Sequence, residues 1–377
     1  MKKLIAISVL FALVAGSVFA QTRVSGALEY AWAAFQSSDI TNSDVKPNTR
    51  TTYNEIYMQI DRTSDDGDAG ALLRYRLKDD GNNHADYRAM ANRAFMWWKP
   101  NDLIRLWFGR DDDGQFGLGD IVGWSYFRGS RWVSREGWDF GGAFIGNFKE
   151  GFAITLTPYM IYDGLTLNIA TALPKFSDQA QRNLEDQYPD YLQISAAIAL
   201  DFGSIHLAWD GAQAGDHKDA IGFAFRSASL IDGISFEIGG AYKLTKDAED
   251  PIQIAYGLVY TGGEWGIKSR MLVKGFDQTK VKTVEGDFVA KDFGLRFEVM
   301  PYYNFDFGSV FCNVKFVVPQ ATTADYGWEI NPYISKSVGS MNMRAGAIIS
   351  NFNSNDGWGG GTDQIYMRLT GAMSFGF

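Results

Sequence analysis

Basic residues recur at alternate positions in two segments of the N-terminal third of the chain. Arg74, Arg76 and Lys78 alternate with apolar residues, and Arg105 does the same within residues 104–108. Because successive side chains of a β-strand point to opposite faces, these cations would share the polar faces of neighbouring strands. Rows of charge across a narrow, wet channel create a transverse field, which orders water and favours small polar solutes over apolar ones. The sequence therefore predicts a pore wall that carries these four cations.

If the strands close into a barrel, the same alternation places further charged residues on its inner face. The basic ones are Arg226, Lys268, Arg270, Lys274, Arg296, Arg344 and Arg368. The acidic ones are fewer: Glu29, Glu55, Asp61, Asp201, Glu237, Asp292, Glu298 and Glu329. The wall thus leans basic, which predicts a mild preference for anions. Alternatively, each inward arginine pairs with a glutamate on the next strand and only satisfies the barrel interior.

Catalysis and metal binding find little support in the residue types present. The chain has three histidines, His84, His206 and His217; the first and last lie in polar loops. His206 shares a strand face with Asp210 but has no convincing serine partner nearby, and nucleophilic catalysis needs a nucleophile with a base in reach. No phosphate-binding loop or zinc spacing is present. We therefore predict neither an enzyme nor a cofactor, and an outer-membrane barrel enzyme is the disfavoured alternative.

The elements that must position the charged residues are strands, and the C-terminal one is the clearest. Residues 364–377 alternate strictly between apolar and polar or small side chains. The segment is long enough to cross a membrane, which takes about 9–11 residues of strand. It ends on Phe377 with Phe375 two positions earlier, and this ending resembles the signal read by the assembly machinery of outer-membrane β-barrels. The alternative is an edge strand of a soluble sandwich, which would leave an apolar row unexplained.

The remaining chain repeats this pattern. After residue 20 no stretch approaches ~18 consecutive apolar residues, although 46% of residues are hydrophobic and 41 are Gly. Loops alternate between short and long, as in an antiparallel transmembrane β-barrel. We expect about 18 strands, within 16–20, because residues 121–134 and 138–148 also alternate and would raise the count to 20.

Outward tryptophans form an interfacial girdle in barrels of this kind. The pattern itself does not decide the facing of residues 95–98, which are all apolar. The residues assigned to the girdle are Trp32, Trp97, Trp209, Trp265 and Trp328.

The N-terminus predicts export. Lys2 and Lys3 precede an apolar run, and the small-residue site ending at Ala20 is suited to cleavage. Residues 1–20 are therefore expected to be a signal peptide, and residues 21–377 a single barrel domain. The net charge of −9 argues against a nucleic-acid partner.

Three segments resemble a known family. The segment Leu106-Trp107-Phe108-Gly109-Arg110, the Gly-rich run ending near Phe140-Gly141-Gly142, and Tyr162-Asp163-Gly164-Leu165 resemble the general diffusion porins of Gram-negative outer membranes. The family's Pro-Glu-Phe-Gly-Gly loop motif reads Trp138-Asp139-Phe140-Gly141-Gly142 here. The resemblance implies a trimer in the outer membrane, with a long third outer loop, residues 111–151, folded into the lumen as a constriction.

Carried over by this resemblance, Arg110 points into the pore, opposite an acidic side formed by Asp111, Asp112, Asp113 and Asp120. The residues alone also fit a solvated surface loop, or a Ca²⁺ site that lacks the glycine and final glutamate of a calcium loop. The predicted function is passive diffusion of small hydrophilic solutes and ions. The alternatives are a plugged barrel acting as an adhesin or structural protein, and a sugar- or anion-specific channel.

Overall fold

The chain forms one antiparallel sheet that closes on itself. The structure is a computed structural model that describes residues 21–37, 45–46, 50–79, 88–111, 150–172, 192–210, 220–228, 232–244, 252–275, 281–283, 286–288, 293–319, 325–352 and 361–376. No helix among these residues is long and apolar enough to cross a membrane. The described parts do not include residues 1–20 or the connection 112–149. The side chain of the girdle candidate Trp32 is also outside the description.

Eighteen strands make the wall. In chain order they are β1 (Gln21–Ser37), β3 (Arg50–Thr63), β4 (Ala69–Asp79), β5 (Arg88–Asn101), β6 (Ile104–Asp111), β7 (Glu150–Leu156), β8 (Leu165–Ala172), β9 (Leu192–Leu200), β10 (Gly203–Asp210), β11 (Ala220–Ser227), β12 (Ile234–Lys243), β13 (Ile252–Gly262), β14 (Trp265–Gly275), β17 (Phe293–Phe305), β18 (Gly308–Val318), β19 (Gly327–Val338), β20 (Met341–Phe352) and β21 (Gly361–Gly376). The short strand β2 (Val45–Lys46) pairs with the end of β1, and β15 (Val281–Thr283) pairs with β16 (Gly286–Phe288) outside the main sheet.

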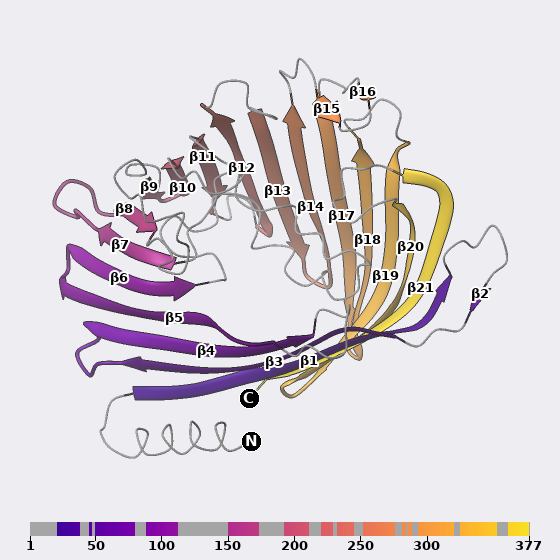
Figure 1. Ribbon diagram of the computed structural model, residues 1–377, viewed down its shortest axis with the longest axis horizontal. Helices are drawn as coiled ribbons and strands as arrows, with labels where there is room; N and C mark the ends of the chain where they lie inside the picture. Colours follow the sequence, from indigo (N-terminus) through magenta and orange to yellow (C-terminus); the bar gives the residue numbers. More distant parts are fainter. Residues whose placement is uncertain are drawn as a thin grey trace.

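Pairing between the first and last strands closes the barrel (Figure 1). The register runs from Ala27↔Gly376 to Ser37↔Met367, with one irregularity after Ala33, and β1 also pairs with β3 along its other edge. Every main-chain edge of the wall is thereby paired, which is what a membrane-spanning sheet requires. The predicted 18-strand antiparallel barrel is confirmed.

The short hairpin turns lie together at one end of the barrel, because consecutive strands alternate in direction. Glycines with positive φ supply several of these turns, among them Gly67 (76°), Gly233 (78°), Gly263 (64°) and Gly339 (58°). An L-residue with a side chain is strained at such angles, whereas glycine is not. Tight turns therefore occur at Asp232-Gly233, Gly262-Gly263 and Gly339-Ser340, in agreement with the predicted alternation of short and long loops.

The two faces of the wall differ in polarity. Large apolar side chains that alternate along the strands are exposed on the outer face, such as Leu28, Met58, Met96 and Phe108. Charged and amide side chains alternate with them and are buried on the inner face, above all in the strands β12 to β20. An apolar outside and a polar inside is the arrangement that a lipid-embedded barrel needs.

Candidate pore-lining site

The predicted basic wall lies on β4 and β6, which are separated by β5. Arg74 and Arg76 project from β4 and Arg105 from β6, and each alternates with outward apolar neighbours such as Tyr75 and Phe108. All three are half-buried on the inner face. Their role in a pore stays a prediction.

Other predicted site residues are described only in part or not at all. For Lys78, Arg110 and Asp111 only the backbone register is known. Lys78 lies opposite Glu55, Arg110 lies opposite Ala94 and Glu150, and Asp111 lies opposite Arg93. Asp112, Asp113 and Asp120 fall outside the described residues. The acidic side of the predicted constriction therefore also stays a prediction.

The arginines on these strands lie against aromatic rings. The guanidinium carbon of Arg74 is 5.3 Å from the ring centre of Tyr57, and that of Arg93 is 5.4 Å from the ring centre of Phe95. These distances fall within the range of cation–π attraction.

Arg105 lies between two indoles. Its guanidinium carbon is 5.0 Å from the ring centre of Trp97 and 5.5 Å from that of Trp107. We call the surface formed by Tyr57, Arg74, Arg93, Phe95, Trp97, Arg105 and Trp107 the arginine–aromatic wall.

Trp97 faces the lumen, so its assignment to the outward girdle is wrong. Its neighbours Met96 and Trp98 are the exposed outward residues, at 57% and 54%. Trp97 is the direct register partner of Trp107, and their ring centres are 6.5 Å apart. Trp98 and Trp265, both exposed, lie on the outer face where a girdle residue belongs.

Small residues make room for the two indoles. The row across the sheet reads Gly70, Trp97, Trp107 and Ala153. A Cβ on Gly70 would come within 2.6 Å of the Trp97 indole, so the indole lies directly over the β4 backbone. Trp107 Nε1 donates a hydrogen bond to Thr155 Oγ1 on β7 at 3.1 Å. Both rings are thus fixed in place.

Farther round the barrel, the inward charges form a row of alternating sign. Following the register across β11, β12, β13, β14, β17, β18 and β19, the row contains Arg226, Glu237, Gly257, Arg270, Glu298, Lys315 and Glu329. We call these residues the ion-pair wall. Opposite charges on directly facing strands attract, whereas like charges repel.

Hydrogen bonds and ion pairs join this row. Arg270 Nη2 is 2.5 Å from Glu298 Oε2, and Arg226 Nε is 3.1 Å from Glu237 Oε1. Lys315 Nζ is 3.1 Å from Glu329 Oε1, and both side chains are at most 2% exposed. For these cations the alternative reading, charges that satisfy the barrel interior, agrees with the structure.

Asn313 extends the contacts of Glu298. Its Nδ2 donates to Glu298 Oε1 at 2.5 Å, and its register partner on β19 is Asn331. Both asparagines are fully buried, and no described group hydrogen-bonds either amide atom of Asn331. Sequence reasoning did not single out these two amides.

A serine–histidine pair was also missed. Ser204 Oγ and His206 Nε2 lie 2.8 Å apart on the inner face of β10. Residues two apart share a strand face, so this partner was visible in the sequence. The side chain of Asp210 is not described, and no group of three or more metal-ligating side chains occurs among the described residues.

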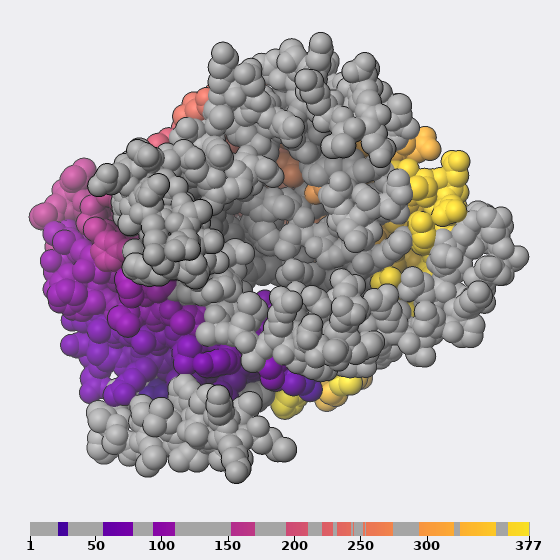
Figure 2. All heavy atoms as spheres, viewed as in Figure 1, coloured from indigo at the N-terminus to yellow at the C-terminus, as the bar shows by residue number. Residues whose placement is uncertain are grey.

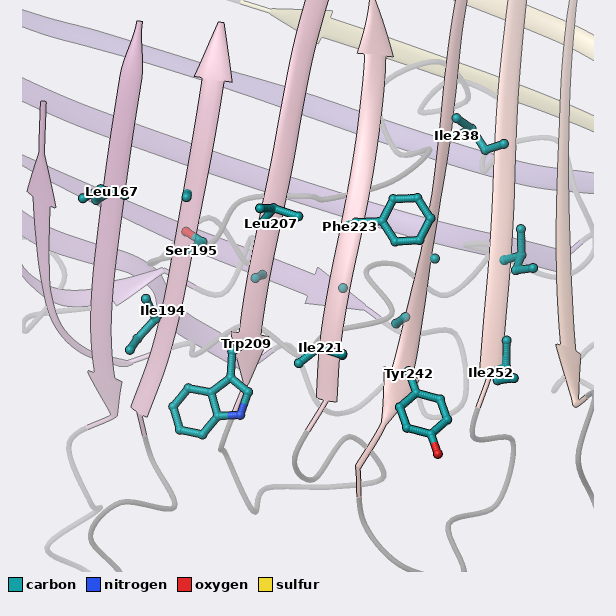
Figure 3. Close-up of a pocket in the computed structure, with 16 residues that line it drawn as sticks. Leu167, Ile194, Ser195, Leu207, Trp209, Ile221, Phe223, Ile238, Tyr242 and Ile252 are labelled. Carbon is teal, nitrogen blue, oxygen red and sulfur yellow. The ribbon is translucent and has the colours of Figure 1, made fainter. Parts of the chain in front are cut away.

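An apolar hollow lies on the outer face of the barrel wall, on the side away from the lumen. It has a volume of about 900 Å³ and spans β8 to β13, with Trp209, Phe223 and Tyr242 among its lining residues (Figure 3). Because these side chains belong to the outward rows, the hollow is not part of the lumen.

Comparison with solved structures identifies the fold. A porin of Rhodopseudomonas blastica, in two engineered variants, matches with 14% and 15% identity and a TM-score of 0.50, over 95% of this chain and 100% of the porin chain. OmpT, an outer membrane protein of Vibrio cholerae in its trimer form, matches with 10% identity and a TM-score of 0.49, over 96% of this chain and 100% of its own. No family model and no curated protein matches in sequence. The chain has the fold of outer-membrane porins, as the motifs predicted.

Proposed function

We propose that this porin-fold chain forms a water-filled channel in the outer membrane, through which small hydrophilic solutes and ions diffuse passively. The observation that carries the proposal is the closed barrel of 18 strands with apolar residues outside and charged residues inside. Barrels of 16–18 strands are wide enough to leave an aqueous channel. Residues 1–20 would be removed on export, and residues 21–377 would form the single mature domain.

The predicted constriction is part of the proposal. The connection that begins at Asp111 would narrow the lumen, with Asp111, Asp112, Asp113 and Asp120 opposite Arg110 and the arginines of β4 and β6. By the resemblance to general porins, three such barrels would assemble into a trimer. The C-terminal strand would be recognised by the barrel-assembly machinery. The short turns would face the periplasm.

Reconstitution tests the channel directly. Purified protein in liposomes should admit small sugars, measured as swelling, and in a planar bilayer it should conduct in steps. Three equal closing steps would report the trimer. In a KCl gradient the reversal potential should indicate mild anion preference. A strong cation preference would refute the proposed selectivity. The absence of both swelling and conduction would refute the channel.

One observation favours a second candidate, a barrel whose lumen is plugged. Glu237, Glu298 and Glu329 belong to the inner face, yet they are at most 1% exposed. Carboxylates along an open aqueous channel would be better solvated. A plugged barrel would serve as an adhesin or structural protein, and it would be properly folded but silent in the swelling and bilayer measurements.

A further inference from the structure

Two tryptophans flank an arginine of the predicted basic wall next to the β5–β6 turn, and the proposed constriction makes no use of these indoles. Trp97 and Trp107 are direct partners across β5 and β6, and Arg105 lies one residue beyond Ile104, where β6 begins. We call Trp97, Arg105 and Trp107 the tryptophan shelf. Phe95, 5.8 Å from Trp107 between ring centres, continues its aromatic surface toward the long-loop end.

The charge of Arg105 is not neutralised by any neighbour in the described part of the chain. Among the described residues no carboxylate forms an ion pair with it, whereas Arg226, Arg270 and Lys315 each have one. The indoles attract the cation through their π-faces but do not cancel its charge. A guanidinium also carries five N–H donors in a plane, and this fork matches a carboxylate. The shelf therefore keeps the capacity to bind an anion.

The shelf is rigid. Trp97 rests over Gly70, and Trp107 is held by its hydrogen bond to Thr155. Because the rings are already ordered, a ligand that stacks on them loses little of its binding energy to ordering the site. A flat or ring-shaped body is what two tilted indoles, 48° between planes, can contact.

We propose that the tryptophan shelf binds small ring-bearing organic anions, with the carboxylate on Arg105 and the ring against Trp97 and Trp107. A neutral sugar would leave the charge unused, and an inorganic anion would leave the indoles unused. The inference rests on the proposed channel, since a solute reaches the shelf through the lumen. It adds a recognition site on the basic wall, at the end of β6 nearest the short turns.

Three probes separate the charge from the ring. Benzoate carries both, acetate carries the charge alone, and benzyl alcohol carries the ring alone. Each is titrated into the purified wild-type barrel in detergent by calorimetry, and each is added to the same protein in a planar bilayer, where binding appears as a saturable reduction of the KCl current. Benzoate should bind, and acetate and benzyl alcohol should bind at least about tenfold more weakly, because hydrogen bonds to a charged group and aromatic contacts each contribute at this scale.

Variants assign the binding to the shelf. Arg105→Gln and Trp107→Leu should each weaken benzoate binding about tenfold or more. Arg105→Lys, which keeps the charge but loses the fork, and Trp107→Phe, which keeps a ring, should lie in between. The matched control is Arg344→Gln on β20, which removes one inward positive charge from the other side of the barrel and should leave benzoate affinity unchanged. Folding of each variant is checked by its β-sheet circular dichroism and its heat-modifiable migration.

The results distinguish this inference from the channel itself. Equal benzoate affinity in wild type, Arg105→Gln and Arg105→Lys would overturn the shelf, as would acetate binding as tightly as benzoate. Conduction without benzoate binding would refute the shelf and leave the channel intact. Benzoate binding by calorimetry in a barrel that does not conduct would support the shelf and refute the channel.

Discussion

The arginine–aromatic wall on β3 to β6 and the ion-pair wall on β11 to β19 both place cations inside the barrel, but they hold them differently. The strands that carry the two walls lie on different sides of the molecule: β3 to β6 are indigo and purple, and β11 to β19 extend to the side of the orange strands (Figure 1 and Figure 2). On the ion-pair wall a carboxylate on the next strand faces each cation. On the arginine–aromatic wall Arg74 and Arg93 are register partners of each other, and rings lie against them.

This difference determines what each wall can do. A carboxylate at 2.5–3.1 Å cancels most of the field of its cation, so the ion-pair wall acts mainly on the barrel itself. An aromatic ring orients a cation without cancelling its charge, so Arg105, which forms no ion pair with a described carboxylate, can act on passing solutes. A count of inward charges from the sequence treats both walls alike and therefore overstates the basic character of the ion-pair wall.

The largest effect should follow from removing one carboxylate of the ion-pair wall. Glu298 is fully buried and accepts from Arg270 and Asn313, so Glu298→Gln should lower the free energy of unfolding by about 3–5 kcal/mol. Urea unfolding of the detergent-solubilised barrel measures this loss of unfolding free energy.

A double variant sharpens this result. Because Arg270→Met together with Glu298→Gln removes both charges, it should lose less stability than Glu298→Gln alone. The control Glu264→Gln, at an exposed turn position, removes the same charge from water-facing surface. A Glu298→Gln barrel as stable as this control would show that the ion-pair wall does not hold the sheet together.

A smaller effect is expected from crowding the tryptophan shelf. Gly70→Ala places a Cβ within 2.6 Å of the Trp97 indole, which should cost about 1–3 kcal/mol of unfolding free energy through overpacking. The matched control is Gly376→Ala, where the nearest atom to an added Cβ is 3.8 Å away. Equal stability of the two variants would mean that Trp97 yields at no cost and the shelf is not rigid.

Much of the fold could be predicted from the sequence, and the reason is geometric. A strict period of two assigns residues 365–375 to their faces, and glycines such as Gly233 and Gly339 identify the turns. An even number of strands then follows, because the first and last strands must pair and the termini must lie at the same end, whereas the choice of 18 within 16–20 was settled by the structure.

The contacts of the site were harder to predict. Residues 95–98 are all apolar, so no alternation reveals that Trp97 faces inward. Arg270 and Glu298 are 28 positions apart, and only the register across β14 and β17 brings them together. Ser204 and His206 needed no such knowledge, and the period of two alone would have paired them.

A further, smaller loss should follow from freeing one ring of the shelf. Thr155→Val removes the acceptor of the Trp107 indole N–H without changing shape, and it should cost about 1 kcal/mol in unfolding free energy. Thr166→Val is the matched control on β8, because its hydroxyl makes no side-chain hydrogen bond within the described residues. Benzoate affinity should fall in the first variant only, and loss in both would point to a general change of the wall.

The smallest effect is expected where an ion pair is exposed. Lys99 Nζ and Asp102 Oδ1 are 2.5 Å apart at the β5–β6 turn, the same separation as Arg270 and Glu298, but Asp102 is 79% exposed. The hydrogen bond from Lys99 lowers the pKa of Asp102 below 3.8, so any stability it gives is present at neutral pH and is lost as the pH falls through that lowered value. Water screens the pair, so Asp102→Asn should leave the unfolding midpoint unchanged at pH 7 and at pH 3. Since distance is equal in the two pairs, a destabilisation like that of Glu298→Gln would show that burial is not what distinguishes the ion-pair wall.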